Sequence, residues 1–150
     1  MATTSTSEIP APAPGDPDAW THRRFFDVLG TLGRLRVIVR SGPSTFEALC
    51  RFGPYDLARG FMNAITDAYH WHLALAPFRH LRSRDAVHER SGRRVLFFEL
   101  REAPDAAPFL LIYLHRDKGA EFDPECEQAF ARAHADLCDG REISLAAERM

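Results

Sequence analysis

The chain alternates apolar and polar residues over several short segments, and this two-residue period constrains its fold most strongly. In RLRVIVR, residues 34–40, the side chains of Leu35, Val37 and Val39 alternate with those of Arg34, Arg36, Ile38 and Arg40. RVLFFELRE (94–102) and FLLIYLHRD (109–117) are longer apolar runs rich in aromatic and aliphatic residues. Such segments predict β-strands rather than helices.

Further strands are expected on either side of these segments. SGP at 41–43 predicts a turn, and STFEALCRF (44–52) would complete a hairpin with 34–40. Residues 68–75 and the charged segment 77–90 are also predicted strands. Residues 55–66 fit a short helix or a strand, because Gly60 and the aromatic content allow both.

Helices are expected at both ends of the strand region. The first would be capped by Asp16 or Asp18 and end at Gly30 or Gly33. Its apolar stripe consists of Phe25, Phe26, Leu29 and Leu32.

The last helix follows DPECEQAF, in which Asp123 is the cap and Pro124 the first residue, and Gly140 would end it. Its buried face would hold Cys126, Phe130, Ala133 and Leu137. The order helix, about six strands, helix predicts an α+β fold with an antiparallel sheet, not a βαβ nucleotide fold.

Composition limits the class of protein. A chain of 150 residues, 45% hydrophobic and 27% charged, is expected to form one soluble domain over 18–145 after a disordered Pro/Ala/Thr-rich tail, 1–17. No segment approaches the ~20 apolar residues of a membrane span. A net charge of −2 gives no nucleic-acid signal, and three cysteines without a paired framework favour the cytoplasm.

The stretch YHWHLAL, 69–75, contains the most informative polar pair. On a strand, His70 and His72 share one face and lie roughly 6.5–7 Å apart, while Trp71 and Leu73 face the core. Two imidazoles at this spacing can converge on one metal ion or one planar ligand. They can also belong to an ordinary solvated surface.

Arginines accompany the histidines on the predicted sheet. Arg36 and Arg40 alternate along one strand, and others flank the two most apolar strands. A sheet face that carries histidine, arginine and aromatic residues suits a flat, apolar, dianionic ligand such as haem, because histidine ligates iron and arginine binds carboxylates. A solvated basic face is the alternative.

Several segments together resemble the bacterial haem-utilisation family that includes HemS, ChuX and HutX. The matching segments occur in the family order and cover about 110 residues, one repeat unit: LGRLRVIVR (32–40), YHWHLAL (69–75), RRVLFFE (93–99), IYLHRD (112–117) and EQAF (127–130).

The resemblance implies a curved antiparallel sheet with flanking helices, a homodimer, and a cytoplasmic haem carrier rather than an enzyme, with a possible role in haem degradation. It places His72 at a family ligand position, with His70 as the second choice. Arg40 and Phe46 occupy two other ligand positions, so those histidines are lost. Arg40 and Arg116 would pair with the haem propionates.

Two other functions fit the same residues. The fold could serve as a protein-interaction or regulatory module without haem, using the tail and the terminal segment DGREISLAAERM as contacts. Alternatively, His70, His72 and His80 could bind one metal ion in a mononuclear enzyme.

Overall fold

The structure, a computed structural model, describes residues 20–146. The predicted tail, 1–17, and the candidate caps Asp16 and Asp18 lie outside the described residues.

Two helices and nine strands make up the described part of the chain, and the α+β class is confirmed. In chain order they are α1 (His22–Leu29), β1 (Arg34–Ser41), β2 (Ser44–Arg51), β3 (Tyr55–Ala58), β4 (Phe61–Ile65), β5 (His70–Ala74), β6 (His80–Val87), β7 (Arg94–Arg101), β8 (Leu110–Leu114), α2 (Pro124–Asp136) and β9 (Ile143–Ser144).

The strands form two sheets. The main sheet has six strands in the order β2-β1-β8-β7-β6-β9, and the small sheet has the order β3-β4-β5. Every pairing between these strands is antiparallel. The predicted six-stranded antiparallel sheet is therefore present. However, the strand expected at 68–75 belongs to the small sheet, and β9 takes the sixth place in the main one.

Residues 55–66, for which the sequence allowed either a helix or a strand, form the hairpin β3–β4. Arg59 and Gly60 both have positive φ angles, 55° and 80°. Two consecutive residues in this conformation reverse the chain within a two-residue turn. Strand pairing then places Asp56 opposite Asn63 and buries Met62 completely.

The first helix begins later than expected. Thr21 caps it, because its hydroxyl oxygen accepts a hydrogen bond from the Arg24 amide at 3.1 Å, and the helix ends at Gly30 as predicted. The last helix has the predicted cap, since Asp123 accepts bonds from two backbone amides. It ends at Asp136, four residues before Gly140, because left-handed residues interrupt it at Cys138 and Asp139.

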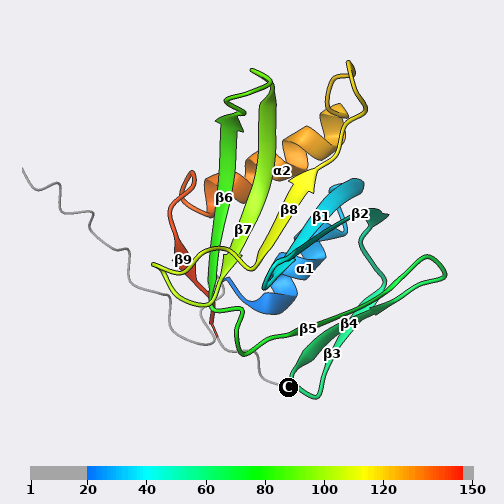
Figure 1. Ribbon diagram of the computed structural model, residues 1–150, viewed down its shortest axis with the longest axis vertical. Coiled ribbons are helices and arrows are strands. Elements are labelled where there is room, and N and C mark those ends of the chain that lie inside the picture. Colours follow the sequence, from blue (N-terminus) through cyan, green and yellow to red (C-terminus); the bar gives the residue numbers. More distant parts are fainter. Residues whose placement is uncertain (1–19, 147–150) are drawn as a thin grey trace, which may run out of the picture.

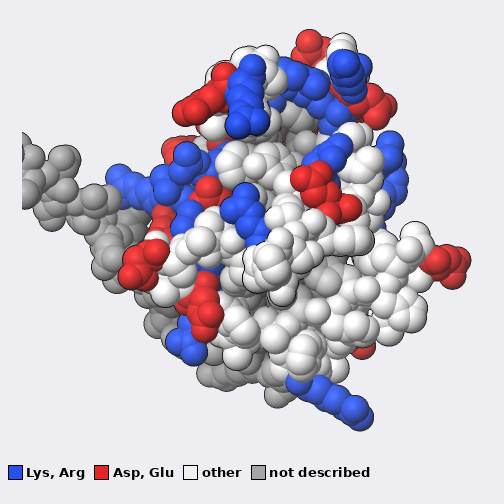
Figure 2. All heavy atoms as spheres, viewed as in Figure 1, with Lys and Arg blue, Asp and Glu red and all other residues white. Residues whose placement is uncertain are grey.

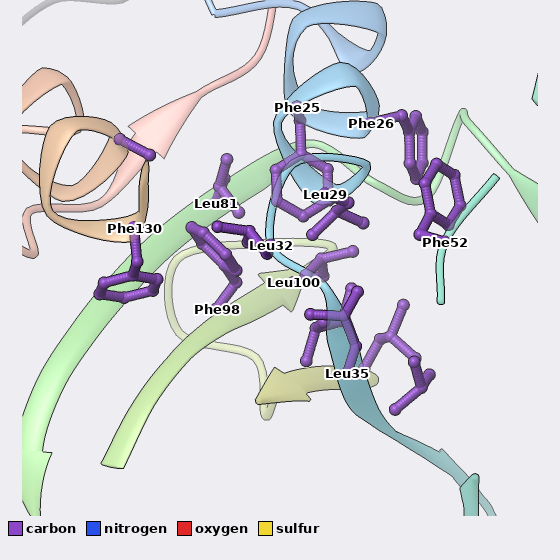
Figure 3. Packing of buried hydrophobic residues seen from close by; sticks show 14 of the residues in the cluster. Phe25, Phe26, Leu29, Leu32, Leu35, Phe52, Leu81, Phe98, Leu100 and Phe130 are labelled. Carbon is purple, nitrogen blue, oxygen red and sulfur yellow. The ribbon is translucent and has the colours of Figure 1, made fainter. Parts of the chain in front are cut away.

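One hydrophobic core joins both helices to one face of the main sheet (Figure 3). Phe98 on β7 is central to it, with its ring centroid 5.3 Å from that of Phe25 on α1 and 5.1 Å from that of Phe130 on α2. Edge-to-face and tilted contacts of this kind are favourable beyond the area they bury. The predicted apolar stripe of the first helix is buried in full.

The opposite face of the main sheet carries no helix within residues 20–146, and Figure 1 views the molecule from this side. The small sheet extends away from the β1–β2 end and packs its inner face, which includes Met62 and Ala64, against the core. A hydrogen bond of 2.6 Å from the Tyr55 hydroxyl to Asp27 also ties β3 to α1. The main sheet therefore offers one free face, and a recess lies where the two sheets meet.

Candidate haem-binding cleft

His70 and His72 lie on the outer face of the small sheet. Both are exposed, and their ring centroids are 6.5 Å apart with the ring planes perpendicular. Trp71, which lies between the two histidines, and Leu73, which follows them, are half-buried against the core. The predicted division of this strand into a histidine face and a core face is confirmed.

The orientation of His72 is set by the neighbouring strand. Its Nδ1 lies 2.8 Å from Asn63 Oδ1, and the Asn63 amide donates in turn to Asp56 Oδ1 at 3.1 Å. Because an amide oxygen only accepts, Nδ1 of His72 donates this bond, and Nε2 is the ring nitrogen left for a ligand. A ligating histidine is commonly oriented in this way. Sequence reasoning missed Asn63 and Asp56, whose roles follow from the strand pairing.

An open cleft of about 390 Å³ lies between the β1–β2 hairpin and the start of β5. Its volume is in the range of small-molecule sites. Aliphatic, aromatic and thiol side chains form most of its wall: Val37, Val39, Phe46, Ala48, Leu49, Cys50, Ala68, Tyr69 and Trp71. His70 completes the lining, whereas His72 is not part of it.

The cleft wall carries little charge. None of its ten lining residues is Asp, Glu, Lys or Arg. Burial raises the pKa of the Cys50 thiol, and burial likewise raises the pKa of Tyr69. The Tyr69 hydroxyl donates to the Arg51 carbonyl at 2.7 Å, which holds its ring in the wall. His70 is the only one of the ten lining residues that carries an imidazole.

Phe46 is the most exposed large apolar residue of the cleft, with 65% of its surface accessible. Leu49 on β2 and Phe61 and Ile65 on β4 are further large apolar residues that are more than 40% exposed. In Figure 2 the region over β2 and the small sheet carries few charged side chains. Phe46, which the motif comparison aligned with a ligand position, lies in the wall of the cleft that His70 also lines.

The structure does not bring the two candidate propionate-binding arginines to this cleft. Arg40 lies near the end of β1 and Arg116 follows β8, whose last residue, Leu114, pairs with Leu35. At a rise of ~3.3 Å per residue, the Cα atoms of Arg40 and Arg116 are about 20 Å apart along the sheet. The structure therefore places Arg40 and Arg116 apart, and neither lines this cleft.

His80 is also separate from the histidine pair. It lies on β6 of the main sheet, where its Nδ1 is 3.4 Å from the Ser144 hydroxyl, while the pair belongs to the small sheet. Across residues 20–146, no three His, Cys, Asp or Glu side chains are grouped so that they could hold a metal ion. The alternative of a three-histidine metal site is contradicted, because His80 belongs to the main sheet and the other two histidines to the small sheet.

Solved structures share this architecture. A crystal structure of ChuX has a TM-score of 0.66 at 16% identity, covering 78% of this chain and 72% of that one. A second solved structure, of the haem-binding protein ChuX, has a TM-score of 0.66 at 17% identity and covers 84% of this chain and 76% of that one. The chain has a ChuX-like fold.

A protein of Agrobacterium tumefaciens has the same fold, with a TM-score of 0.65, 16% identity, and coverage of 77% of this chain and 66% of that one. No protein-family model and no curated protein sequence matches the chain.

None of the helices between residues 20 and 146 is long and apolar enough to cross a membrane. The resemblance inferred from YHWHLAL and the strand motifs is thus confirmed at the level of the fold.

Proposed function

We propose that this protein binds haem in the cleft between the β1–β2 hairpin and β5. The observation that carries the proposal is the position of His70, an exposed imidazole that completes the lining of an otherwise apolar cleft in a ChuX-like fold. Haem would supply an iron centre with an open coordination position. The apolar wall excludes water from one face of the macrocycle, and an imidazole ligates iron.

His70 is the proposed iron ligand, and this choice differs from the one that the motif comparison favours. His72 has the better oriented ring, but it lies outside the cleft lining. A haem held by His72 would instead lie over the outer face of the small sheet, near Phe61 and Asn63. The two positions therefore predict different sites, and single substitutions separate them.

A carrier role in the cytoplasm is part of the proposal. All three cysteines are free, which suits a reducing compartment. Release of the cargo requires an accessible site, and the cleft opens to solvent at Phe46. Homodimer formation, which the family resemblance implies, is also proposed, with the unpaired edge of β2 in the main sheet as the contact. Light scattering of the purified protein with and without haem tests this assembly.

The proposed function is tested by titrating the purified protein with hemin, the oxidised form of haem, and following the Soret band. A saturable red shift at one equivalent is expected, with a dissociation constant in the micromolar range or below. A linear increase in absorbance without a shift would contradict haem binding.

A further inference from the structure

A second cleft lies on the helix-free face of the main sheet, at the opposite end of β1 from Arg40. Its volume is about 390 Å³, and it is formed by β1, β7, β8 and the segments that follow β6 and β8. In Figure 2, basic side chains gather around the upper part of this face. We name it the basic cleft, defined by Arg36, Arg93, Arg94 and Arg116.

Two of the four arginines are already neutralised. Arg36 forms an ion pair with Glu47 at 3.0 Å. Arg94 binds Asp85 and also Glu127, at 2.8 and 2.7 Å. None of these three carboxylates belongs to the cleft wall, since no acidic residue lines the cleft.

Arg93 and Arg116 retain their charge. Neither forms an ion pair with an acidic side chain of the described part of the chain. Arg116 is nevertheless held in place, because its Nη2 donates to the Arg94 carbonyl at 2.7 Å and its guanidinium lies 4.2 Å from the centre of the Phe122 ring. A fixed guanidinium loses little conformational entropy when it binds an oxyanion.

The rest of the wall combines three polar residues, His88, Ser91 and His115, with apolar and aromatic ones. Ile38 and Val95 lie between the arginines, and Tyr113 and Phe122 contribute aromatic rings. The ring of Tyr113 stacks on Phe97 with centroids 4.5 Å apart and planes 18° apart. Such a surface suits the ring of a ligand, while the two unpaired arginines suit its anionic group.

We propose that the basic cleft binds a small molecule in which a phosphate or carboxylate group is attached to a flat ring. Arg116 and Arg93 bind the oxyanion, and Tyr113, Ile38 and Val95 contact the ring. This site is separate from the haem cleft, shares none of its residues and does not depend on the proposed function.

The test uses phenyl phosphate and benzoate as probes, with inorganic phosphate and phenol as their separate halves. Binding to the full chain is followed by calorimetry and by amide chemical shifts. Phenyl phosphate, benzoate or both should bind saturably, with a dissociation constant below about 10 mM. The whole probe should bind at least tenfold more tightly than either half, and amides at 93–95 and 113–116 should shift while those at 68–71 do not.

Substitutions assign the binding to the two arginines. Arg116→Gln should weaken the binding about tenfold, as loss of a charge-assisted bond does. Arg93→Gln should have a similar effect, and it serves as the second variant because Arg93 makes no ion pair whose loss would disturb folding. Arg132→Gln, at an exposed position of α2, removes the same charge elsewhere and should leave binding unchanged.

Three results would overturn the proposal. One is the absence of saturable binding by both aryl probes. Another is equal affinity for a whole probe and one of its halves, which would show that the arginines and the apolar wall do not act together. The third is equal affinity of the Arg116, Arg93 and Arg132 variants.

Discussion

The rings of His70 and His72 lie 6.5 Å apart on the same face of β5, yet only His70 lines the apolar cleft. His70 pairs with Ile65 and His72 with Asn63 on β4, so His70 is nearer the turn that joins β4 to β5. Two residues that are equivalent in their local sequence pattern thus differ in their surroundings.

Phe46 should contribute to haem binding but not to folding. Its side chain is 65% exposed, so Phe46→Ala should change the free energy of unfolding by less than about 0.5 kcal/mol. Removing the ring opens the cleft wall, and hemin affinity should fall several-fold in a Soret titration. Val87→Ala, at another exposed apolar position, is the matched control. Equal hemin affinities for the two variants would contradict a role for Phe46.

Cys50 should report on occupancy of the cleft. Burial raises the pKa of its thiol, so alkylation by iodoacetamide should be slow at pH 7 and become faster as the pH rises. Hemin in the cleft should slow this alkylation further, because Cys50 is part of the lining.

Cys126 provides the internal control for this measurement. Burial also raises its pKa, but it lies near the start of α2, away from the haem cleft. Mass spectrometry of each cysteine peptide at pH 9 gives both rates. Equal protection of Cys50 and Cys126 by hemin would show that haem does not bind specifically in the cleft.

Acid should weaken the link between β6, β7 and α2. Hydrogen bonds from Arg94 hold the pKa of Asp85 below its ordinary value. A folded-state pKa below the unfolded one means that the carboxylate stabilises the fold above about pH 4, and that this contribution disappears as pH falls through the folded pKa. Asp85→Asn should therefore cost about 0.5–1 kcal/mol near pH 7, the range of a partly exposed ion pair.

Urea unfolding of wild type and Asp85→Asn between pH 3 and 7 measures this effect. The difference in unfolding free energy should be largest near neutrality and become small toward pH 3. Arg132→Gln controls for loss of a surface charge. A difference that does not vary with pH would contradict the stated role of the Asp85 carboxylate.

The centre of the core should be the most sensitive position for stability. Phe98 is 1% exposed and contacts Phe25 and Phe130, so Phe98→Ala should cost about 3–5 kcal/mol. Phe61→Ala, at a 42% exposed position, should cost far less. Thermal unfolding of the two variants compares them directly, and similar melting temperatures would contradict this assignment of the core.

The sequence predicted most of the strands, because apolar and polar residues alternate along each strand as its two faces are buried and exposed. Leu35 and Val37 are buried and Arg34 is exposed, as the alternation indicates. The small sheet was not predicted, because its separation depends on the hairpin turn at Arg59 and Gly60 and on which strands pair. A two-residue period identifies a strand without identifying its neighbours.

The same reason explains what could be predicted of the sites. The shared face of His70 and His72 follows from their spacing of two residues. Only His70 of the pair lines the cleft, because β2 lies near residues 68–71. This proximity cannot be predicted from the local sequence. The basic cleft likewise depends on β8 lying between β1 and β7, which brings Arg36, Arg94 and Arg116 together.

The most direct test of the haem cleft compares hemin titrations of wild type, His70→Ala and His72→Ala by Soret absorbance. Both histidines are exposed, so both variants should fold as wild type does. His70→Ala should lose the Soret shift and at least tenfold in affinity, while His72→Ala should remain within about threefold of wild type. Loss of the shift in His72→Ala alone, with His70→Ala unchanged, would contradict binding in the cleft.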